Sequence, residues 1–153
     1  MKRRTIYTLC SVILTVCALT ACHKDKFQTK PTISVKEINN TDVPSPDGML
    51  RITLECTDKE GDEGNGLLTY IRVRTNSTAI PDPNNNDKPD TAVATVPDFP
   101  SKDKVEMTLD IPYSFLDEDP GLNDTMYFKL TLTDRGNNQS DTISTVPIVA
   151  KQF

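Results

Sequence analysis

The sequence contains no tryptophan, and its single histidine is His23. Beyond this residue the chain therefore has no histidine for a Ser-His-Asp triad, a Cys-His pair or a mixed Cys and His zinc site. Two carboxylates can in principle act as acid and base, but acidic residues are spread along the chain and no pattern selects a pair. The sequence therefore predicts a protein that is not an enzyme.

Cysteine and basic residues are also scarce. Cys10 and Cys17 lie in an apolar N-terminal segment, Cys22 follows it, and Cys56 stands alone, so no internal disulfide is expected. Cys56 alternates in phase with apolar neighbours, which predicts a small buried side chain. Three of the 17 Lys and Arg residues precede Cys22, which leaves 14 against 22 Asp and Glu, a net charge near −8. Nucleic acid and anionic membrane surfaces are therefore not expected partners.

The N-terminal segment has the layout of a secretory signal peptide. Residues 1–4 are basic, and Thr5–Thr20 is apolar apart from Thr and Ser but short for a membrane span. Leu19-Thr20-Ala21-Cys22 resembles the lipobox of bacterial lipoproteins. The resemblance implies cleavage before Cys22, acyl chains such as palmitate on its sulfur and amine, and a stable membrane anchor. An uncleaved anchor helix is the alternative.

The residue after the lipobox bears on location. His23 stands where the retention rule of enteric bacteria requires Asp, so the resemblance favours the outer membrane, with either face possible. The expected organisation is a signal peptide over 1–21, a lipidated N-terminus and flexible tether over 22–31, and one domain over 32–153.

Beyond residue 31 the chain is a series of short runs in which apolar and polar residues alternate. Gly, Pro, Asn and Asp separate these runs about every 8–12 residues, which is typical of a sandwich. The expected strands are 32–38, 49–57, 67–75, 91–96, 104–111, 125–133 and 140–150. The fold prediction is all-β, an antiparallel two-sheet sandwich that is immunoglobulin-like. A jelly roll or a small barrel is the alternative.

Several local expectations accompany this fold. In 67–75, Ile71 and Val73 are expected to point inward, with the arginines at 72 and 74 outward. The run 91–96 is expected at a sheet edge, and Tyr113–Asp117 in one helical turn. Pro147 removes a ladder donor, so 140–150 is expected to meet an edge or a bulge there.

The stretch Asp58–Gly66 is the most unusual part of the sequence, with four carboxylates and three glycines in nine residues. Its first acids have the 1-3-5 spacing of an EF-hand, but position six is Glu63 and position twelve is Thr69, so it is not an EF-hand. A looser calcium site is one interpretation, with the weak affinity of extracellular modules, ~10⁻⁴–10⁻³ M. A solvated acidic turn without a ligand is the other. The candidate ligands are Asp58, Glu60, Asp62, Glu63 and Asp134.

Asp134 joins this set through the expected topology. In an immunoglobulin-like sandwich the loop after the second strand and the turn between the last two strands lie at one end. Asp134 is then expected near Asp58 and Asp62, although Arg135 could instead neutralise them. The first strand also starts there, so this end is expected to face the anchoring membrane.

The acidic loop, followed by Asp134-Arg-Gly-Asn137 and Ser140-Asp-Thr142, resembles a family of small Gram-negative bacterial lipoproteins with an immunoglobulin-like domain. Glu60 and Glu63 stand where that family has Asp or Gly. The resemblance implies a sandwich and a lipid anchor but no particular activity.

Two further surface features have functional interpretations. Tyr70 and Tyr127 fall on outward phases, which would suit a modest sugar-stacking patch. Thr91, Thr125 and Thr142 each follow Asp and precede an aliphatic residue, which resembles an O-glycosylation sequon of some Gram-negative bacteria. Together the sequence predicts a lipid-anchored envelope protein that acts as a binding or accessory module for a protein or glycan partner. The alternative is a calcium-stabilised adhesin or glycan-binding subunit.

Overall fold

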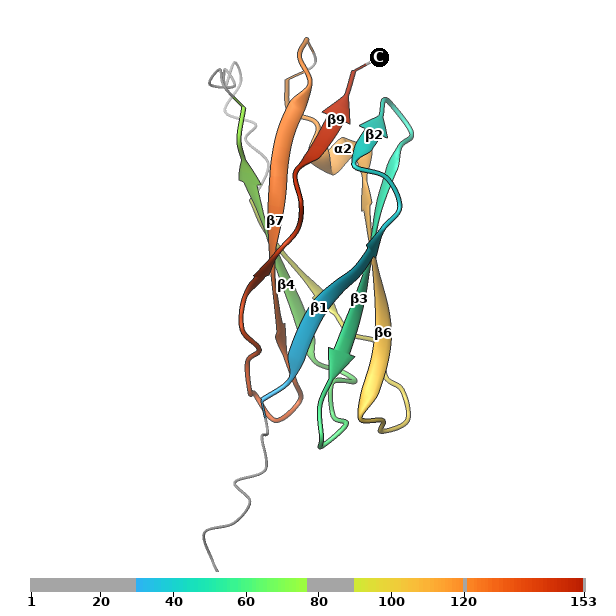
Figure 1. Ribbon diagram of the computed structural model, residues 1–153, viewed down its shortest axis with the longest axis vertical. Helices are drawn as coiled ribbons and strands as arrows, with labels where there is room; N and C mark the ends of the chain where they lie inside the picture. Colours follow the sequence, from blue (N-terminus) through green and yellow to red (C-terminus); the bar gives the residue numbers. More distant parts are fainter. Residues whose placement is uncertain (1–29, 77–89, 120, 153) are drawn as a thin grey trace, which may run out of the picture.

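The computed structural model describes residues 30–76, 90–119 and 121–152. The expected signal peptide, Cys22 and nearly all of the tether lie outside these residues. Two β-sheets pack face to face (Figure 1). One has the order β1 (Thr32–Ile38), β3 (Met49–Thr57), β6 (Lys104–Pro112). The other has the order β2 (Asp42–Pro44), β9 (Ile148–Lys151), β7 (Asp124–Thr133), β4 (Leu67–Arg74), β5 (Thr91–Thr95), and β8 (Ile143–Ser144) pairs with β7. The predicted all-β sandwich of two sheets is confirmed.

The core lies between the two sheets and follows the period-2 pattern of the sequence. The inward apolar residues of β3 and β7 have a relative exposure of 0% and are Leu50, Ile52, Leu54, Cys56, Met126, Phe128, Leu130 and Leu132. Each large apolar side chain buried this way contributes roughly 1.5–3 kcal/mol. Cys56 packs as the small apolar residue that was predicted, and burial raises the pKa of its thiol to about 12.

The prediction for β4 was wrong in phase. Leu68, Tyr70 and Arg72 lie opposite the inward residues of β7, and Ile71 and Val73 face outward. Arg72 is inward because it has acceptors there. Its guanidinium donates to the carbonyl of Phe115 and to the Glu118 carboxylate (2.8 Å), and it lies 4.8 Å from the centroid of the Phe115 ring. The segment after β6 supplies these partners, and alternation within one strand does not reveal them.

The C-terminal part also departs from prediction. The single strand expected over 140–150 is two strands, β8 and β9, and Pro147 lies between them rather than at an edge. The turn-rich segment before β3 contains the unpredicted β2, which pairs in parallel with β9. The sheet is therefore not wholly antiparallel.

Two local predictions are confirmed. β5 is at the edge of its sheet, and Tyr113–Leu116 forms the helical turn α2. Within the described part of the chain, no helix has the length and apolar character that crossing a membrane requires.

Candidate metal centre

The acidic loop begins directly after β3 and folds against the segment between β5 and β6. The backbone N–H of Asp58 donates to the carbonyl of Asp103 (3.1 Å), and Ser101 Oγ donates to the carbonyl of Glu60 (3.3 Å). At the far end of the loop, the N–H of Val96 donates to the carbonyl of Gly66 (2.9 Å). These bonds fix the loop at both ends.

Two glycines of the loop are required by close packing. Gly61 has φ +61°, and a Cβ there would lie 2.5 Å from Ser101 Oγ and 2.8 Å from the N of Lys102. A Cβ on Gly66 would lie 2.4 Å from the carbonyl oxygen of Thr133. Both contacts are shorter than side chains tolerate, so glycine lets the loop approach its neighbours.

The turn after β7 forms the opposite wall of the site. The N–H of Asn138 donates to Asp134 Oδ1 (2.8 Å), and Asn138 Nδ2 donates to Oδ2 (3.0 Å), which fixes the Asp134 carboxylate. The backbone N–H of Arg135 donates to the carbonyl of Asp62 (3.2 Å) and joins this turn to the acidic loop. The prediction that the loop and the turn share one end is confirmed, and Figure 1 shows both at the lower end of the sandwich.

Three carboxylates from these two segments converge. Asp58, Asp62 and Asp134 each place one oxygen within 4.8 Å of the other two. Asp58 and Asp134 are buried, with 3% and 4% exposure. Oxygens that share one Ca²⁺ lie at most about 5 Å apart, because each is 2.3–2.6 Å from the ion. The spacing of the three carboxylates therefore suits calcium.

Two carboxylate oxygens at this point receive no hydrogen bond from the protein. They are Asp58 Oδ2 and Asp62 Oδ1, both fully covered. Asp58 Oδ1 accepts the N–H of Glu60 (3.0 Å), so Asp58 is oriented while its other oxygen is left without a donor. Burial raises the pKa of Asp58 to about 6, and the neighbouring Asp62 carboxylate adds to this rise against the opposing Glu60 N–H. A bound cation or a shared proton would satisfy these atoms.

The other two candidate ligands are placed differently. Glu60 is exposed and lies outside the group of three. Glu63 is also outside the group, but its exposure is 0%, and neither of its oxygens has a hydrogen-bond donor. Burial first, and then the charges of Asp62 and Asp134, raise the pKa of Glu63. The sequence alone does not distinguish Glu60 from Glu63, because both lie in the same acidic stretch.

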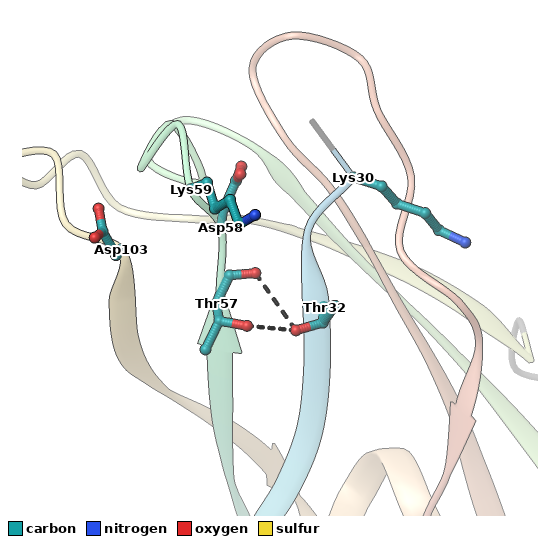
Figure 2. Close-up of a pocket in the computed structure, with 6 residues that line it drawn as sticks. All are labelled: Lys30, Thr32, Thr57, Asp58, Lys59 and Asp103. Atoms are coloured by element: carbon teal, nitrogen blue, oxygen red, sulfur yellow. Dashed lines mark hydrogen bonds between the residues drawn. The ribbon is translucent and has the colours of Figure 1, made fainter. Parts of the chain in front are cut away.

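Basic side chains do not neutralise the three carboxylates. Among the residues that the structure describes, no ion pair joins a Lys or Arg to any of them, and Arg135 is exposed. Lys30 borders an open pocket of about 240 Å³ beside Asp58, but its side chain points away (Figure 2) and pairs with Asp141 at 2.6 Å. The structure therefore does not place Arg135 in the neutralising role considered from the sequence.

The surface predictions have mixed outcomes. Tyr70 is not a sugar platform, because its ring packs against Phe115 and Phe128 at centroid distances of 5.9 and 6.4 Å. Of the three threonines in O-glycosylation sequons, Thr91 and Thr142 are exposed, whereas Thr125 is half-buried beside Asn76.

Comparison with known proteins adds little to this description. No protein-family model matches the chain, and no match is found among curated proteins. A β-glucosidase from Kluyveromyces marxianus has a similar solved structure, with 13% identity and a TM-score of 0.38. The match covers 79% of this chain but 15% of the β-glucosidase.

Proposed function

We propose that this chain is a lipid-anchored protein of the bacterial cell envelope, in the outer membrane, and that its domain is a non-catalytic binding or accessory module stabilised by calcium. The calcium site consists of Asp58, Asp62 and Asp134. The observation that carries the proposal is the pair of buried oxygens, Asp58 Oδ2 and Asp62 Oδ1, that lack a donor within a group of three carboxylates. The partner of the module is a protein or a glycan.

The physical argument for calcium is one of charge and spacing. Three carboxylates held this close repel one another, and burial removes the water that would screen them. Ca²⁺ takes six to eight oxygens in flexible geometry, whereas Mg²⁺ requires near-ideal octahedral geometry at 2.0–2.1 Å. Three carboxylates supported by water and loop carbonyls fit the calcium preference better. A site with so few protein ligands has a Kd of ~10⁻⁴–10⁻³ M.

The location of the site supports a structural role for the ion. Asp58 belongs to the loop after β3 and Asp134 to the turn after β7, so one ion joins the two sheets. Thr32 begins β1 at the same end, where it contacts Thr57 next to Asp58 (Figure 2). A chain anchored through Cys22 would enter the domain here. Calcium would then reinforce the end of the domain that carries the tether.

Paired variants in one loop test the calcium site. We expect 10 mM calcium to stabilise the wild-type chain by about 1.4–2.7 kcal/mol for a Kd of ~10⁻³–10⁻⁴ M, and to raise Tm by several degrees. Asp62→Asn should abolish this shift. Glu60→Gln, the same chemical change at an exposed position, should retain it. Equal shifts in the two variants, or none in the wild type, would sink the calcium proposal.

The lipid anchor is tested separately. Cells fed an alkyne analogue of palmitate should label the wild-type chain and carry it in the outer-membrane fraction. Cys22→Ser should lose the label, because the acylated sulfur is gone. Labelling that persists in Cys22→Ser would contradict the assignment of the anchor.

A further inference from the structure

Among the described residues the sandwich has five edge strands, and four of them carry features that discourage pairing with another strand. β8, which pairs only with β7, has two residues. β1 has a register shift between Val35 and Glu37. β2 is three residues long and includes Pro44. β6 carries three charged residues, which discourage pairing: Lys104, Glu106 and Asp110. β5 has none of these features, because Thr91-Ala-Val-Ala-Thr95 contains no charge, no proline and no bulge.

The outer edge of β5 has backbone groups available for pairing. Among the described residues, no strand lies beyond β5 in its sheet. The N–H of Val96 donates to Gly66 (2.9 Å), and the carbonyl of Asp90 accepts from Arg72 (2.7 Å), so even-numbered residues of this segment bond to the β4 side. Because an antiparallel ladder alternates, the N–H and C=O groups of Thr91, Val93 and Thr95 point to the outer edge.

The sequence of β5 reads the same in both directions, Thr-Ala-Val-Ala-Thr. An antiparallel neighbour with this sequence, centred on Val93, places Val93 opposite Val93 and Thr91 opposite Thr95. The three residues with outward backbone groups then form the hydrogen-bonded pairs, with about six hydrogen bonds. We infer that β5 is a self-association site, where two copies of this chain join edge to edge through a twofold axis at Val93. Such an interface is isologous, as most dimer interfaces are.

The charge distribution favours a second copy at this edge. The outer face of the three-stranded sheet carries ion pairs, among them Arg51–Asp110 (2.8 Å) and Lys104–Glu55 (2.7 Å). The outward residues of β5 and of its neighbour β4 are uncharged and are Thr91, Val93, Thr95, Leu67, Thr69, Ile71 and Val73. For an acidic chain, joining two copies along this uncharged margin keeps like charges apart.

Pairing in this register sets the orientation of the two copies. β5 runs from Asp90 toward Val96, which lies beside the acidic loop. In an antiparallel pair, the acidic ends of the two copies therefore point in opposite directions. The two N-terminal ends leave from opposite ends of the dimer, an arrangement that suits contact between two anchored surfaces.

Disulfide trapping of the full chain, purified in detergent, tests the pairing. Val93→Cys should form a covalent dimer on mild oxidation about tenfold faster than Val146→Cys, because hydrogen-bonded partners have Cα atoms about 5.5 Å apart, within disulfide range. Val146 is the matched control for Val93, because the two side chains have similar exposures of 54% and 57%. The native Cys56 is buried, so it does not contribute.

The register is tested with two more single variants. Thr91→Cys and Thr95→Cys should cross-link to each other when mixed, and each should cross-link poorly alone, because only Thr91 and Thr95 of different copies face one another. In sedimentation, Val93→Lys should shift the wild-type dimer to monomer, whereas Val146→Lys should not. Equal trapping of Val93→Cys and Val146→Cys, or a wild-type chain that sediments as a monomer at tens of micromolar, would overturn the inference. These results do not depend on calcium.

Discussion

At the scale of the residue, the four acids of one loop occupy three environments. Asp58 and Asp62 join the group of three, Glu60 faces solvent, and Glu63 is fully buried without a hydrogen-bond donor. Composition selected this loop as the chemically unusual part of the sequence, and two of its acids converge with Asp134 in the structure. The sequence could not distinguish the environments of the four acids, because their burial depends on contacts with Asp103 and Thr133, which are remote in the sequence.

The burial of Glu63 leads to a prediction about stability and pH. Without calcium, the folded chain holds protons on Glu63 and Asp58 more tightly than the unfolded chain, because both pKa values are raised. Their contribution to stability is full below the ordinary carboxyl pKa of about 4 and is lost as pH rises through the raised values, about 6 for Asp58. Urea unfolding in chelator should therefore show a free energy of unfolding that declines from about pH 4 to about pH 6.

Glu63→Gln isolates the part of this decline that belongs to Glu63. The variant keeps the shape of the side chain and removes its charge, so at pH 7.5 it should be more stable than the wild type by about 1 kcal/mol. Its pH dependence should be shallower, and its response to calcium should persist, since Glu63 is outside the group of three. A destabilised variant would show instead that the Glu63 carboxylate has a required partner.

At the scale of the element, period-2 alternation predicted strands well where one face is wholly apolar. β3 and β7 have that pattern, and their inward residues are buried as expected. β4 carries apolar residues on both faces, so alternation alone did not give its phase. The phase is set by Arg72, whose acceptors come from the segment after β6.

Short strands were the other elements that the sequence pattern did not predict. β2 has three residues and β8 has two, too few for a period to appear in the sequence. β2 exists because it pairs with β9, more than a hundred residues away in the chain. Pro147 was expected at an edge or a bulge of one strand, but it lies in the gap between β8 and β9.

At the scale of the whole molecule, topology contributed more to the candidate site than any motif did. The EF-hand spacing fails, yet placing the two turns at one end of an immunoglobulin-like sandwich predicted that Asp134 lies near Asp58 and Asp62, and it does. Topology did not predict the net charge of the site, because it did not decide whether Arg135 neutralises the carboxylates. In the structure Arg135 is exposed.

The two proposals belong to different parts of the molecule. The calcium site lies at the end of the sandwich where β1 begins, and the self-association site lies along the β5 edge. Calcium would reinforce the anchored end, and edge pairing would join domains side by side in opposite directions. Each proposal therefore fails or holds independently of the other.

The most direct test of the calcium site is an NMR titration of the ¹⁵N-labelled full chain with calcium at pH 7.5. The proposal predicts amide shifts concentrated in 58–66 and 134–138, with saturation at one ion per chain and a Kd of ~10⁻⁴–10⁻³ M. Asp62→Asn should remove these shifts. A spectrum that stays unchanged at 10 mM calcium, or shifts scattered over surface acids away from these two segments, would contradict the account.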